Sequence, residues 1–311
     1  MLGNSDYATK KVLVTGGSGF IGSMLCDHLC QQGAEVHAIS RQARSTSGAN
    51  IRWWQGDLAD HDAVQRLFAA IKPDITFHLA SEVTGSRELA MVLPTLNANL
   101  LSAVNILIAA TEHDCRRVVM AGSLEEPETD THQVVPCSPY AAAKWASSGY
   151  ARMFHALYQT PVVMARLYMV YGPGQQDLRK LVPYVTLSLL RGEVPRLSSG
   201  QRPVDWIYVA DIVNGLLAMG LAAGIDGGTL ELGSGELVTT HKVVEMLSEI
   251  IDAGIEPDFG AFPDRPMEQV RTADVKDTRQ SIGWQPAVSL QQGLEETVAW
   301  YRQLLESGKL S

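Results

Sequence analysis

The chain has 311 residues, of which 46% are hydrophobic and 19% charged, and its formal net charge is −9 at pH 7. This composition is typical of an ordinary globular protein and excludes a long disordered chain. The acidic balance argues against nucleic acid as a partner, because binding to a phosphate backbone needs an excess of lysine and arginine. A phosphorylated small molecule stays open, since a few local arginines can bind it.

The sequence predicts no metal site, signal peptide or membrane span. Its cysteines lack the spacing with histidine that zinc sites need. Cys26 and Cys30, one helical turn apart, favour buried thiols in a reducing compartment. Residues 1–10 have no apolar core of the signal-peptide kind, and no window approaches the ~20 apolar residues of a membrane helix. We therefore expect a cytoplasmic protein that contacts no membrane.

Short apolar runs alternate with helical patterns over residues 11–165. The expected strands cover 11–16, 35–40, 51–56, 75–80, 116–122 and 162–168, and the expected helices lie near 20–32, 60–71, 94–113 and 139–158. This alternation predicts an α/β fold, a Rossmann-type doubly wound parallel sheet with helices on both faces and right-handed crossovers.

The first strand leads into a glycine-rich stretch, Thr15–Gly22, that opens a helix. Strand, tight glycine turn and helix are the context of a dinucleotide site. One glycine permits the turn, one lets the backbone approach a pyrophosphate, and one lets the helix pack on the strand. The helix N-terminus adds free N–H groups and partial positive charge. We expect Gly16, Gly19, Phe20 and Ile21 to bind the dinucleotide; the alternative is a plain strand-to-helix turn.

Residues after the second and third strands bear on the choice of cofactor. NAD sites usually place a carboxylate after the second strand, whereas this chain has Ser40 and Arg41 there, with Arg44 close by. Arginine can pair with a 2′-phosphate that a carboxylate would repel. NADP(H) is therefore favoured and NAD(H) possible, and a solvated basic loop is the alternative. Asp57, followed by Leu58, either accepts from the adenine amino group or is an acidic helix-start residue.

The end of the fourth strand, Leu79-Ala80-Ser81, lies at the sheet edge where doubly wound folds bind ligands. We expect these three residues to contact the cofactor. Asn99 begins a helical segment and is either a further cofactor contact or a buried polar residue of structural purpose.

A catalytic group is expected where the fifth strand meets the following helix. Ser138 as N-cap and Pro139 as first helical residue start that helix, and a spacing of four puts Tyr140 and Lys144 on one face. A tyrosine of pKa ~10 needs about 4 kcal/mol of differential stabilisation to reach ~7, and a nearby ammonium acts in that direction. Together with Ser123, at the tip of the neighbouring strand, the pair is the best catalytic candidate. Alone, Tyr-x-x-x-Lys is a common helix-surface pattern.

These residues together resemble the extended short-chain dehydrogenase/reductase family, which contains nucleotide-sugar epimerases, dehydratases and reductases. The resemblance covers nearly the whole chain. The matching stretches are Thr15–Gly22, Asp57-Leu58, His78–Ala80, Asn99, Ser123, Tyr140 and Lys144, Arg166-Leu167, Tyr171–Gln175, Asp205–Asp211, Gly233–Gly235, Arg265-Pro266, and Leu290 with Gly293-Leu294.

The resemblance implies a role for each catalytic candidate. Tyr140 would be the general acid/base on a sugar hydroxyl or carbonyl, and Lys144 would hold the nicotinamide ribose and tune Tyr140. Ser123 would hydrogen-bond the reacting oxygen. Hydride would pass between the nicotinamide and a ring carbon, usually C4.

The resemblance also implies a division of the chain and a partner. Residues 1–168 would form the dinucleotide-binding domain, with 204–236 returning to it. Residues 169–203 and 237–311 would form a smaller C-terminal α/β lobe that closes over the nucleotide diphosphate. The alanine- and leucine-rich helices 97–113 and 139–158 would pair across a twofold axis to give a homodimer.

Departures from the family pattern affect the substrate contacts. Met169 stands where the family often has asparagine, and Val204 stands where an arginine usually precedes the Asp-aromatic pair. Arg202, two residues earlier, either serves the diphosphate from a shifted position or is a solvated loop residue. Arg265 is the better diphosphate candidate, and Arg196 and Arg271 are weaker ones.

The stretch after the fifth strand separates the possible reactions. Many 4,6-dehydratases of the family carry Thr-Asp-Glu there, and Leu124 in the Asp position disfavours dehydration although Glu125 remains. Gly122–Glu126 is more similar to the Gly-Ser-x-Glu-Glu of 4-keto-6-deoxy nucleotide-sugar reductases. Glu125 would then contact substrate; alternatively, Glu125 and Glu126 lie on an exposed loop.

The leading hypothesis is therefore an NADPH-dependent 4-keto reductase of a nucleotide-activated deoxysugar. A nucleotide-sugar 4-epimerase with retained NAD is the next hypothesis, followed by a reductase of a non-sugar ketone. A non-catalytic dinucleotide sensor is the contrasting class, and it has no use for the acid/base group.

Overall fold

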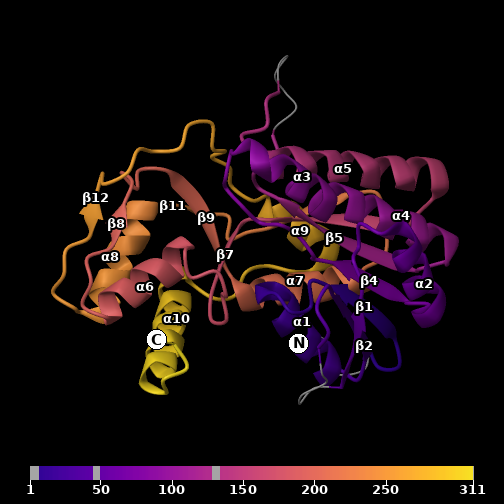
Figure 1. Cartoon of the computed structure of the whole chain (residues 1–311), viewed down its shortest axis with the longest axis horizontal. Helices are drawn as coiled ribbons and strands as arrows, with labels where there is room; N and C mark the ends of the chain where they lie inside the picture. Colours follow the sequence, from indigo (N-terminus) through magenta and orange to yellow (C-terminus); the bar gives the residue numbers. More distant parts are fainter. Residues whose placement is uncertain (1–6, 45–49, 128–133, 311) are drawn as a thin grey trace. The chain divides into compact units, whose positions relative to one another are not determined.

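The computed structural model of the chain describes residues 7–44, 50–127 and 134–310 (Figure 1). These residues form two compact units. Unit 1 contains 1–167, 213–231 and 277–284, and unit 2 contains 168–212, 232–276 and 285–311. The chain therefore passes several times between the units.

Unit 1 is built on a seven-stranded parallel sheet in the order β10-β6-β5-β4-β1-β2-β3. Its strands are β1 Lys11–Thr15, β2 Glu35–Ser40, β3 Ile51–Gln55, β4 Ile75–His78, β5 Arg117–Ser123, β6 Val162–Leu167 and β10 Thr229–Leu232. The order reverses at β1, which pairs with both β2 and β4. The Rossmann-type fold class and all six predicted strands are confirmed.

Helices cover both faces of this sheet, as the alternating pattern predicted (Figure 1). They are α1 Phe20–Gln31, α2 His61–Ile71, α3 Val92–Thr95, α4 Ser102–Glu112, α5 Pro139–Tyr158, α7 Val209–Leu221 and α9 Val275–Ile282. α2, α4 and α5 bury Phe68, Ile106 and Phe154 in one apolar cluster. α1 packs against β1 and β2, and the Tyr7 hydroxyl donates to the Leu217 carbonyl of α7 (2.8 Å).

One helical run differs from the sequence prediction. Helical turns extend from Leu89 to Glu112 through a short helix η1, Leu89–Met91, the helix α3, and a π-helical segment η2, Leu96–Leu101. Among the described residues this run alone is long and apolar enough to cross a membrane, so the expectation that no window approaches that length was wrong. Its second half is a core helix of unit 1, because Ala103, Ile106 and Leu107 are buried there. The cytoplasmic location stays a prediction.

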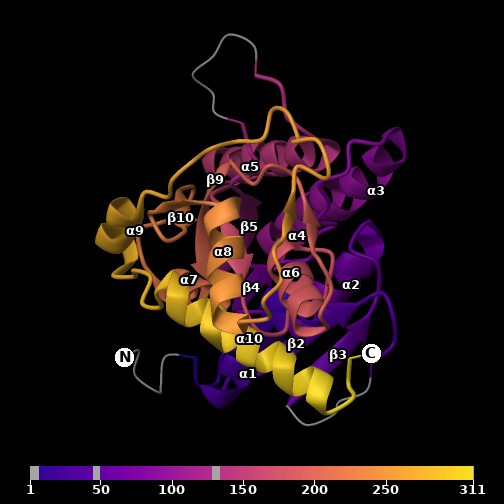
Figure 2. The ribbon, with the colours of Figure 1, turned by 90° about the vertical axis from the view of Figure 1, so that its left-hand side faces the viewer.

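Unit 2 combines small sheets with three packed helices. Its strands are β7 Met169–Tyr171, β8 Arg196–Leu197, β9 Pro203–Tyr208, β11 Leu237–Thr239 and β12 Asp258–Phe259. The helices α6 Leu181–Leu190, α8 Thr240–Ile251 and α10 Leu290–Glu306 lie side by side (Figure 2). They enclose a core that includes Tyr171, Trp206 and Leu294. Gly293 is required there, since a Cβ would overlap the Tyr171 hydroxyl.

A buried carboxylate organises the turns of unit 2. Asp205 on β9 is 1% exposed. It accepts hydrogen bonds from the Ser234 N–H and hydroxyl (2.6 and 2.8 Å), and from the Gly235 and Ala273 N–H groups (both 3.0 Å). Hydrogen bonds to both oxygens satisfy the buried charge. Asp205 therefore joins β9 to two loops that are distant in sequence.

The unit boundaries differ from the predicted domain boundaries. Residues 204–212 and 232–236 were expected with the dinucleotide-binding domain, yet they belong to unit 2. Residues 277–284 were expected in the substrate lobe, and they belong to unit 1. The reason is pairing: β9 joins β7 and β11, whereas Thr278 on α9 bonds the backbone of Glu231 on β10. That unit 2 binds substrate stays a prediction.

Candidate dinucleotide and catalytic site

The glycine-rich turn after β1 brings backbone atoms too close together for side chains. Gly16 has φ +71°, and a Cβ there would lie 2.7 Å from the Ala80 nitrogen. A Cβ on Gly22 would overlap the Gly16 carbonyl. These two glycines let α1 and the loop after β4 pack against the turn. Gly19 is different, since its nearest atom for a Cβ is the Gly16 oxygen at 3.3 Å.

The start of α1 fits an anionic ligand. Gly19 is its N-cap, and no side chain caps the helix. In contrast, Asp60, Ser138 and Ser289 cap α2, α5 and α10 through side-chain oxygens. The N-cap of α1 thus supplies no side-chain acceptor to its first turn, and a helix N-terminus favours phosphate. Gly16, Gly19, Phe20 and Ile21 lie at this turn, where a pyrophosphate would be held.

The loop after β4 is fixed against the same turn. The Thr15 hydroxyl bonds His78 Nδ1 (2.9 Å) and accepts from the Ala80 N–H (3.1 Å). His78 is fully buried, and burial lowers its pKa to about 3, so its ring is neutral. Leu79 donates its N–H to the Thr15 carbonyl (3.2 Å). Leu79 and Ala80 were predicted from the sequence as cofactor contacts, whereas the Thr15–His78 contact was not predicted.

Asn99 has a clear structural purpose. It is 1% exposed within the π-helical segment. Its Oδ1 accepts from the Ser81 hydroxyl (2.9 Å) and the Glu82 N–H (2.7 Å), and its amide donates to the Glu82 carbonyl (3.1 Å). Asn99 therefore holds Ser81 at the end of β4. A direct cofactor contact by Asn99 stays a prediction.

The ends of β2 and β3 place the cofactor-choice residues together. The Ser40 hydroxyl accepts from the Gln42 N–H (3.2 Å) and the Arg41 carbonyl from Gln55 (3.3 Å). The Arg41 side chain is exposed. Arg44 stacks on the Trp53 ring, 5.5 Å from its centroid. Arg41 and Arg44 therefore form an exposed basic edge, and a contact with a 2′-phosphate there stays a prediction.

Asp57 does not cap the helix that follows it. Asp60 is the N-cap of α2, and Asp57 instead accepts from the Ala59 N–H (3.0 Å) in an exposed turn. The helix-start alternative for Asp57 was therefore wrong. Leu58 is buried, and its carbonyl accepts from Asn105 (2.9 Å).

Ser123, Tyr140 and Lys144 come together where β5 ends and α5 begins. Ser138 caps α5 through the Ala141 N–H (3.1 Å) and Pro139 is its first residue, as predicted. The Ser123 side chain hydrogen-bonds Tyr140. The Lys144 ammonium is buried and donates to the Ala121 carbonyl of β5 (2.8 Å). Side chains from a strand end and one helix face are thus brought to one place, and their acid/base role stays a prediction.

The electrostatics differ from the expected lowering of the Tyr140 pKa by Lys144. Burial raises the Tyr140 pKa to about 12, opposed by the Ser123 hydrogen bond and assisted by Glu126 and Glu125. Burial lowers the Lys144 pKa to about 8, and Glu126 opposes that shift. The chain's own groups therefore keep the phenol protonated at neutral pH. Bringing a pKa of about 12 to ~7 would take about 7 kcal/mol.

The two acidic residues after Ser123 lie in different environments. Glu125 is half-buried and accepts from the Cys137 thiol (3.2 Å). Glu126 is 2% exposed, so the exposed-loop alternative was wrong for it. Leu124, which stands where many dehydratases of the family carry aspartate, is buried and apolar. The sequence pointed to Glu126 only because it belongs to the stretch Gly122–Glu126, and that stretch does not indicate whether the side chain is buried.

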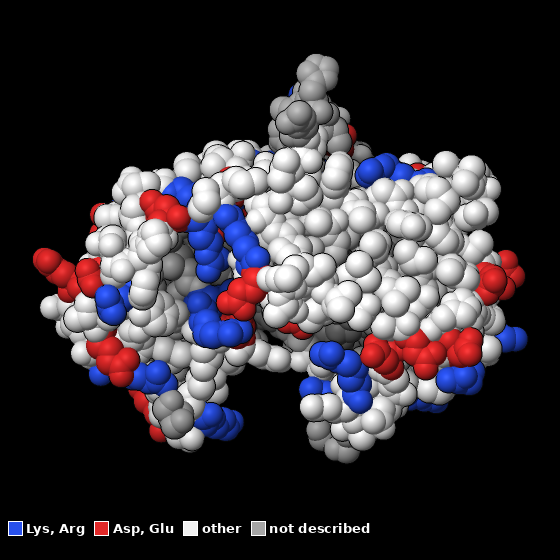
Figure 3. Space-filling model, turned by 45° about the horizontal axis from the view of Figure 1, so that its top comes forward, with Lys and Arg blue, Asp and Glu red and all other residues white. Residues whose placement is uncertain are grey.

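The predicted substrate arginines lie in unit 2. Arg202 pairs with Glu268 (2.9 Å) and donates to the Gln269 carbonyl (2.6 Å), so it is not a solvated loop residue. Arg265 is more exposed and lies 3.9 Å from the same carboxylate. In the space-filling view of Figure 3, lysine and arginine side chains gather with acidic ones left of the centre. A diphosphate contact by either arginine stays a prediction.

Comparison with known proteins identifies the family and the fold that this chain shares. A sequence model described as the NAD dependent epimerase/dehydratase family matches residues 12–233. The dTDP-glucose 4,6-dehydratase of Neisseria gonorrhoeae is 28% identical, over 94% of this chain and 95% of that protein.

Two solved structures share the fold over nearly their whole length. The UDP-glucose 4-epimerase of Thermotoga maritima, determined with UDP-glucose, has a TM-score of 0.87 and 25% identity, and the match covers 95% of this chain and 99% of that one. The Bordetella bronchiseptica enzyme WbmF, determined with NADH, has a TM-score of 0.83 and 26% identity, over 97% and 95% of the two chains.

The glycines of the turn generate a prediction that separates packing from ligand binding. Gly22→Ala should destabilise the protein by about 1–3 kcal/mol, because its methyl group overlaps backbone. Gly19→Ala should cost less than about 1 kcal/mol, as a poorer N-cap, yet weaken dinucleotide binding at least ~10-fold by filling the ligand's place. Thermal unfolding with and without dinucleotide measures both effects. Equal dinucleotide stabilisation of Gly19→Ala and wild type would contradict the assignment.

Proposed function

The chain belongs to the NAD-dependent epimerase/dehydratase family of extended short-chain dehydrogenases/reductases, and on that premise we propose that it reduces the 4-keto group of a nucleotide-activated deoxysugar. The observation that carries this proposal is the geometry of the Ser123–Tyr140–Lys144 group, in which Ser123 hydrogen-bonds Tyr140 and Lys144 donates to the Ala121 carbonyl of the strand that ends at Ser123. A general acid must carry its proton before the reaction. Reduction of a ketone needs such a donor at the carbonyl oxygen.

The residues that hold the cofactor and the three catalytic candidates have separate tasks in the proposed reaction. The bound nicotinamide cofactor, held by Gly16, Gly19 and the adjoining turn, would supply the hydride that reduces C4. The Ser123 hydroxyl orients the keto oxygen, and Tyr140 delivers its proton to that oxygen. Lys144 keeps a positive charge beside the reacting groups, supported by the Ala121 carbonyl.

The buried, apolar side chain of Leu124 argues against dehydration. Elimination of water across C5 and C6 requires an acid beside the leaving hydroxyl, and a buried leucine cannot supply a proton. The similarity to the dTDP-glucose dehydratase therefore supports a nucleotide-sugar substrate more than the same reaction. A 4-epimerase with retained NAD is the second candidate, favoured by the similarity to the UDP-glucose 4-epimerase.

The exposed arginines after β2 support NADP(H) within this proposal. Arg41 and Arg44 occupy the edge where an NAD site usually carries a carboxylate. The structural relative WbmF was determined with NADH. The proposed preference for NADP(H) therefore rests on the residues of this chain and is not taken from that relative.

The apolar surface of unit 1 supports a homodimer. Leu89 and Leu93 are 87% and 68% exposed at the start of the helical run, and Leu157 on α5 is 66% exposed. The remaining exposed apolar side chains on these helices are Val92, Leu96, Leu101, Tyr150 and Tyr158. Exposed apolar side chains gathered on neighbouring helices favour an interaction surface. A second copy of the chain is the proposed partner.

Replacing the acid gives the first test of the proposed function. Tyr140→Phe should lower turnover about 10²- to 10⁴-fold, the usual contribution of a positioned acid. Turnover would be measured with dTDP- and UDP-linked 4-keto-6-deoxyhexoses and NADPH. Tyr158→Phe, at the exposed end of the same helix, is the matched control and should keep wild-type turnover. Near-normal activity of Tyr140→Phe would exclude the assigned role.

The cofactor preference can be tested by titration. Arg41→Ala should weaken NADPH binding about 10- to 100-fold, as expected for a lost charge-assisted hydrogen bond, and should change NADH binding little. Arg52→Ala removes an exposed arginine that pairs with Glu35 (2.6 Å) and should change neither affinity. Equal losses for both cofactors, or stoichiometric NAD released from the purified protein, would favour the epimerase instead.

The dimer can be tested by sedimentation at micromolar concentration. The wild type should sediment as a dimer, and Leu93→Glu combined with Leu157→Glu should be monomeric, because charges would be buried at the contact. Leu237→Glu, at an exposed position of β11 in unit 2, should leave the dimer intact. A monomeric wild type would overturn this proposal.

A further inference from the structure

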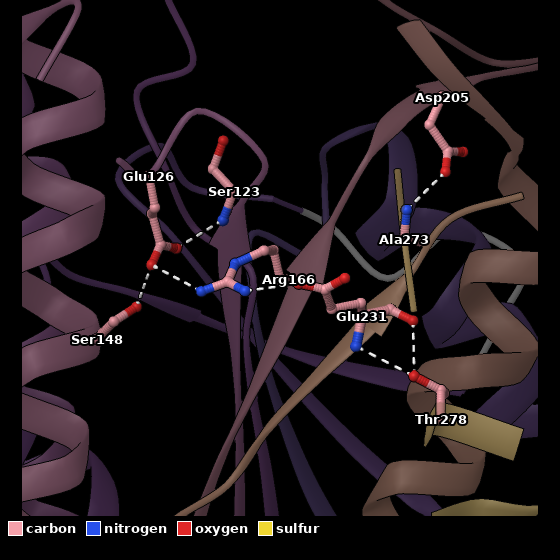
Figure 4. A network of polar contacts seen from close by, with 8 residues as sticks. All are labelled: Ser123, Glu126, Ser148, Arg166, Asp205, Glu231, Ala273 and Thr278. Atoms are coloured by element: carbon pink, nitrogen blue, oxygen red, sulfur yellow. Dashed lines mark hydrogen bonds and ion pairs between the residues drawn. The ribbon is translucent and has the colours of Figure 1, made fainter. Parts of the chain in front are cut away.

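Glu126 follows β5, the strand that ends at Ser123, and both of its carboxylate oxygens accept hydrogen bonds (Figure 4). Oε1 accepts from the Ser123 N–H (2.8 Å) and Oε2 from the Ser148 hydroxyl of α5 (2.7 Å). The Arg166 guanidinium on β6 lies 3.9 Å from Oε2. This carboxylate therefore joins β5, α5 and β6 at one point.

The local sequence makes room for this buried charge. A Cβ on Gly122 would lie 2.7 Å from Glu126 Oε1 and would push the carboxylate from its present place beside the Ser123 N–H. Arg166 is in turn held by Glu231 on β10 (2.6 Å). Burial of a carboxylate is unfavourable unless hydrogen bonds and charges compensate it.

The contacts of Glu126 reach both partners of the acid/base pair. Its hydrogen bond fixes the backbone of Ser123, the residue whose side chain bonds Tyr140. Its charge acts on Tyr140 and on Lys144, raising the pKa of each. The other groups acting on Tyr140 are Ser123 and Glu125, and those around Lys144 are the Ala121 carbonyl and the neutral His78.

We propose that Glu126 is a positioning residue for proton transfer, which fixes Ser123 under Tyr140 and keeps the Tyr140–Lys144 pair in its proton-donating state. The proposal rests on the proposed role of Tyr140 as the acid. Glu126 acts through Ser123 and through its charge, without touching the substrate.

The sign of the charge effect gives a specific readout. Removing the negative charge stabilises the phenolate and destabilises the ammonium, so the pKa of both groups falls. Reduction needs both the protonated phenol and the charged ammonium, so its rate falls first as pH rises through the lower of the two pKa values, that of Lys144 at about 8. In Glu126→Gln, the alkaline limb of the kcat profile should therefore move to lower pH by about one unit. A purely structural role would lower kcat at every pH without moving the limb.

The experiment compares four forms of the full-length protein in the 4-keto reduction with NADPH. Glu126→Gln should show the shifted limb and a kcat about 10-fold lower, with KM nearly unchanged. Glu126→Asp keeps the charge but withdraws it from Ser123, and it should lose kcat while its limb stays in place. Glu231→Gln breaks the second ion pair of Arg166 and should leave the limb in place. Wild type is the reference.

Hydrogen exchange in the cofactor-free protein gives a readout independent of activity. The Ser123 amide should exchange at least ~10-fold faster in Glu126→Asp than in wild type, because its acceptor is withdrawn. This measurement also decides the positioning role if Glu126→Gln does not fold. An unmoved limb in folded Glu126→Gln, an equal shift in Glu231→Gln, or unchanged exchange and kcat in Glu126→Asp would overturn the proposal.

Failure of this inference is distinguishable from failure of the proposed function. If Tyr140→Phe loses turnover while Glu126→Gln keeps the wild-type profile, Tyr140 remains the acid and only the role of Glu126 is wrong. If Tyr140→Phe keeps near-normal turnover, the acid assignment and the inference built on it are both wrong.

Discussion

The close approach of the turn after β1 to the loop after β4 is the constraint on which unit 1 depends. Backbone meets backbone there, so Gly16 and Gly22 cannot carry side chains. The Thr15 hydroxyl joins the two strands by bonding His78 and the Ala80 N–H. Because β1 pairs with β2 on one side and β4 on the other, this junction is also where the strand order reverses. Doubly wound sheets generally bind ligands at such a point.

The second determinant of the site is the burial of charged and titratable groups. Tyr140, Lys144 and Glu126 lie together around the end of β5. Burial raises the pKa of Tyr140 and lowers that of Lys144, whereas Glu126 favours the protonated form of both. The balance keeps a proton on the phenol and a charge on the ammonium. Asp205 in unit 2 has a simpler role, because its bonds all hold backbone or a neighbouring hydroxyl.

Much of the local structure could be read from the sequence, because it depends on short-range patterns. Apolar runs and helical spacing identified β1 to β6 and the main helices of unit 1, and Ser138-Pro139 identified the start of α5. Boundaries that depend on distant partners were missed. β9 was assigned to the wrong unit because its partners, β7 and β11, are determined by strand pairing that one-dimensional periodicity does not encode.

By itself the sequence determined the fold class, the glycine-rich turn and the identity of the acid/base candidates, because each is a pattern of neighbouring residue types. Only the tertiary structure decided the environment of those residues. Whether Glu126 is solvated or buried, and whether Lys144 or burial dominates the pKa of Tyr140, depends on side chains from β5, α5 and β6 meeting in space. Desolvation is a property of that packing, and the same residues in an open loop would titrate differently.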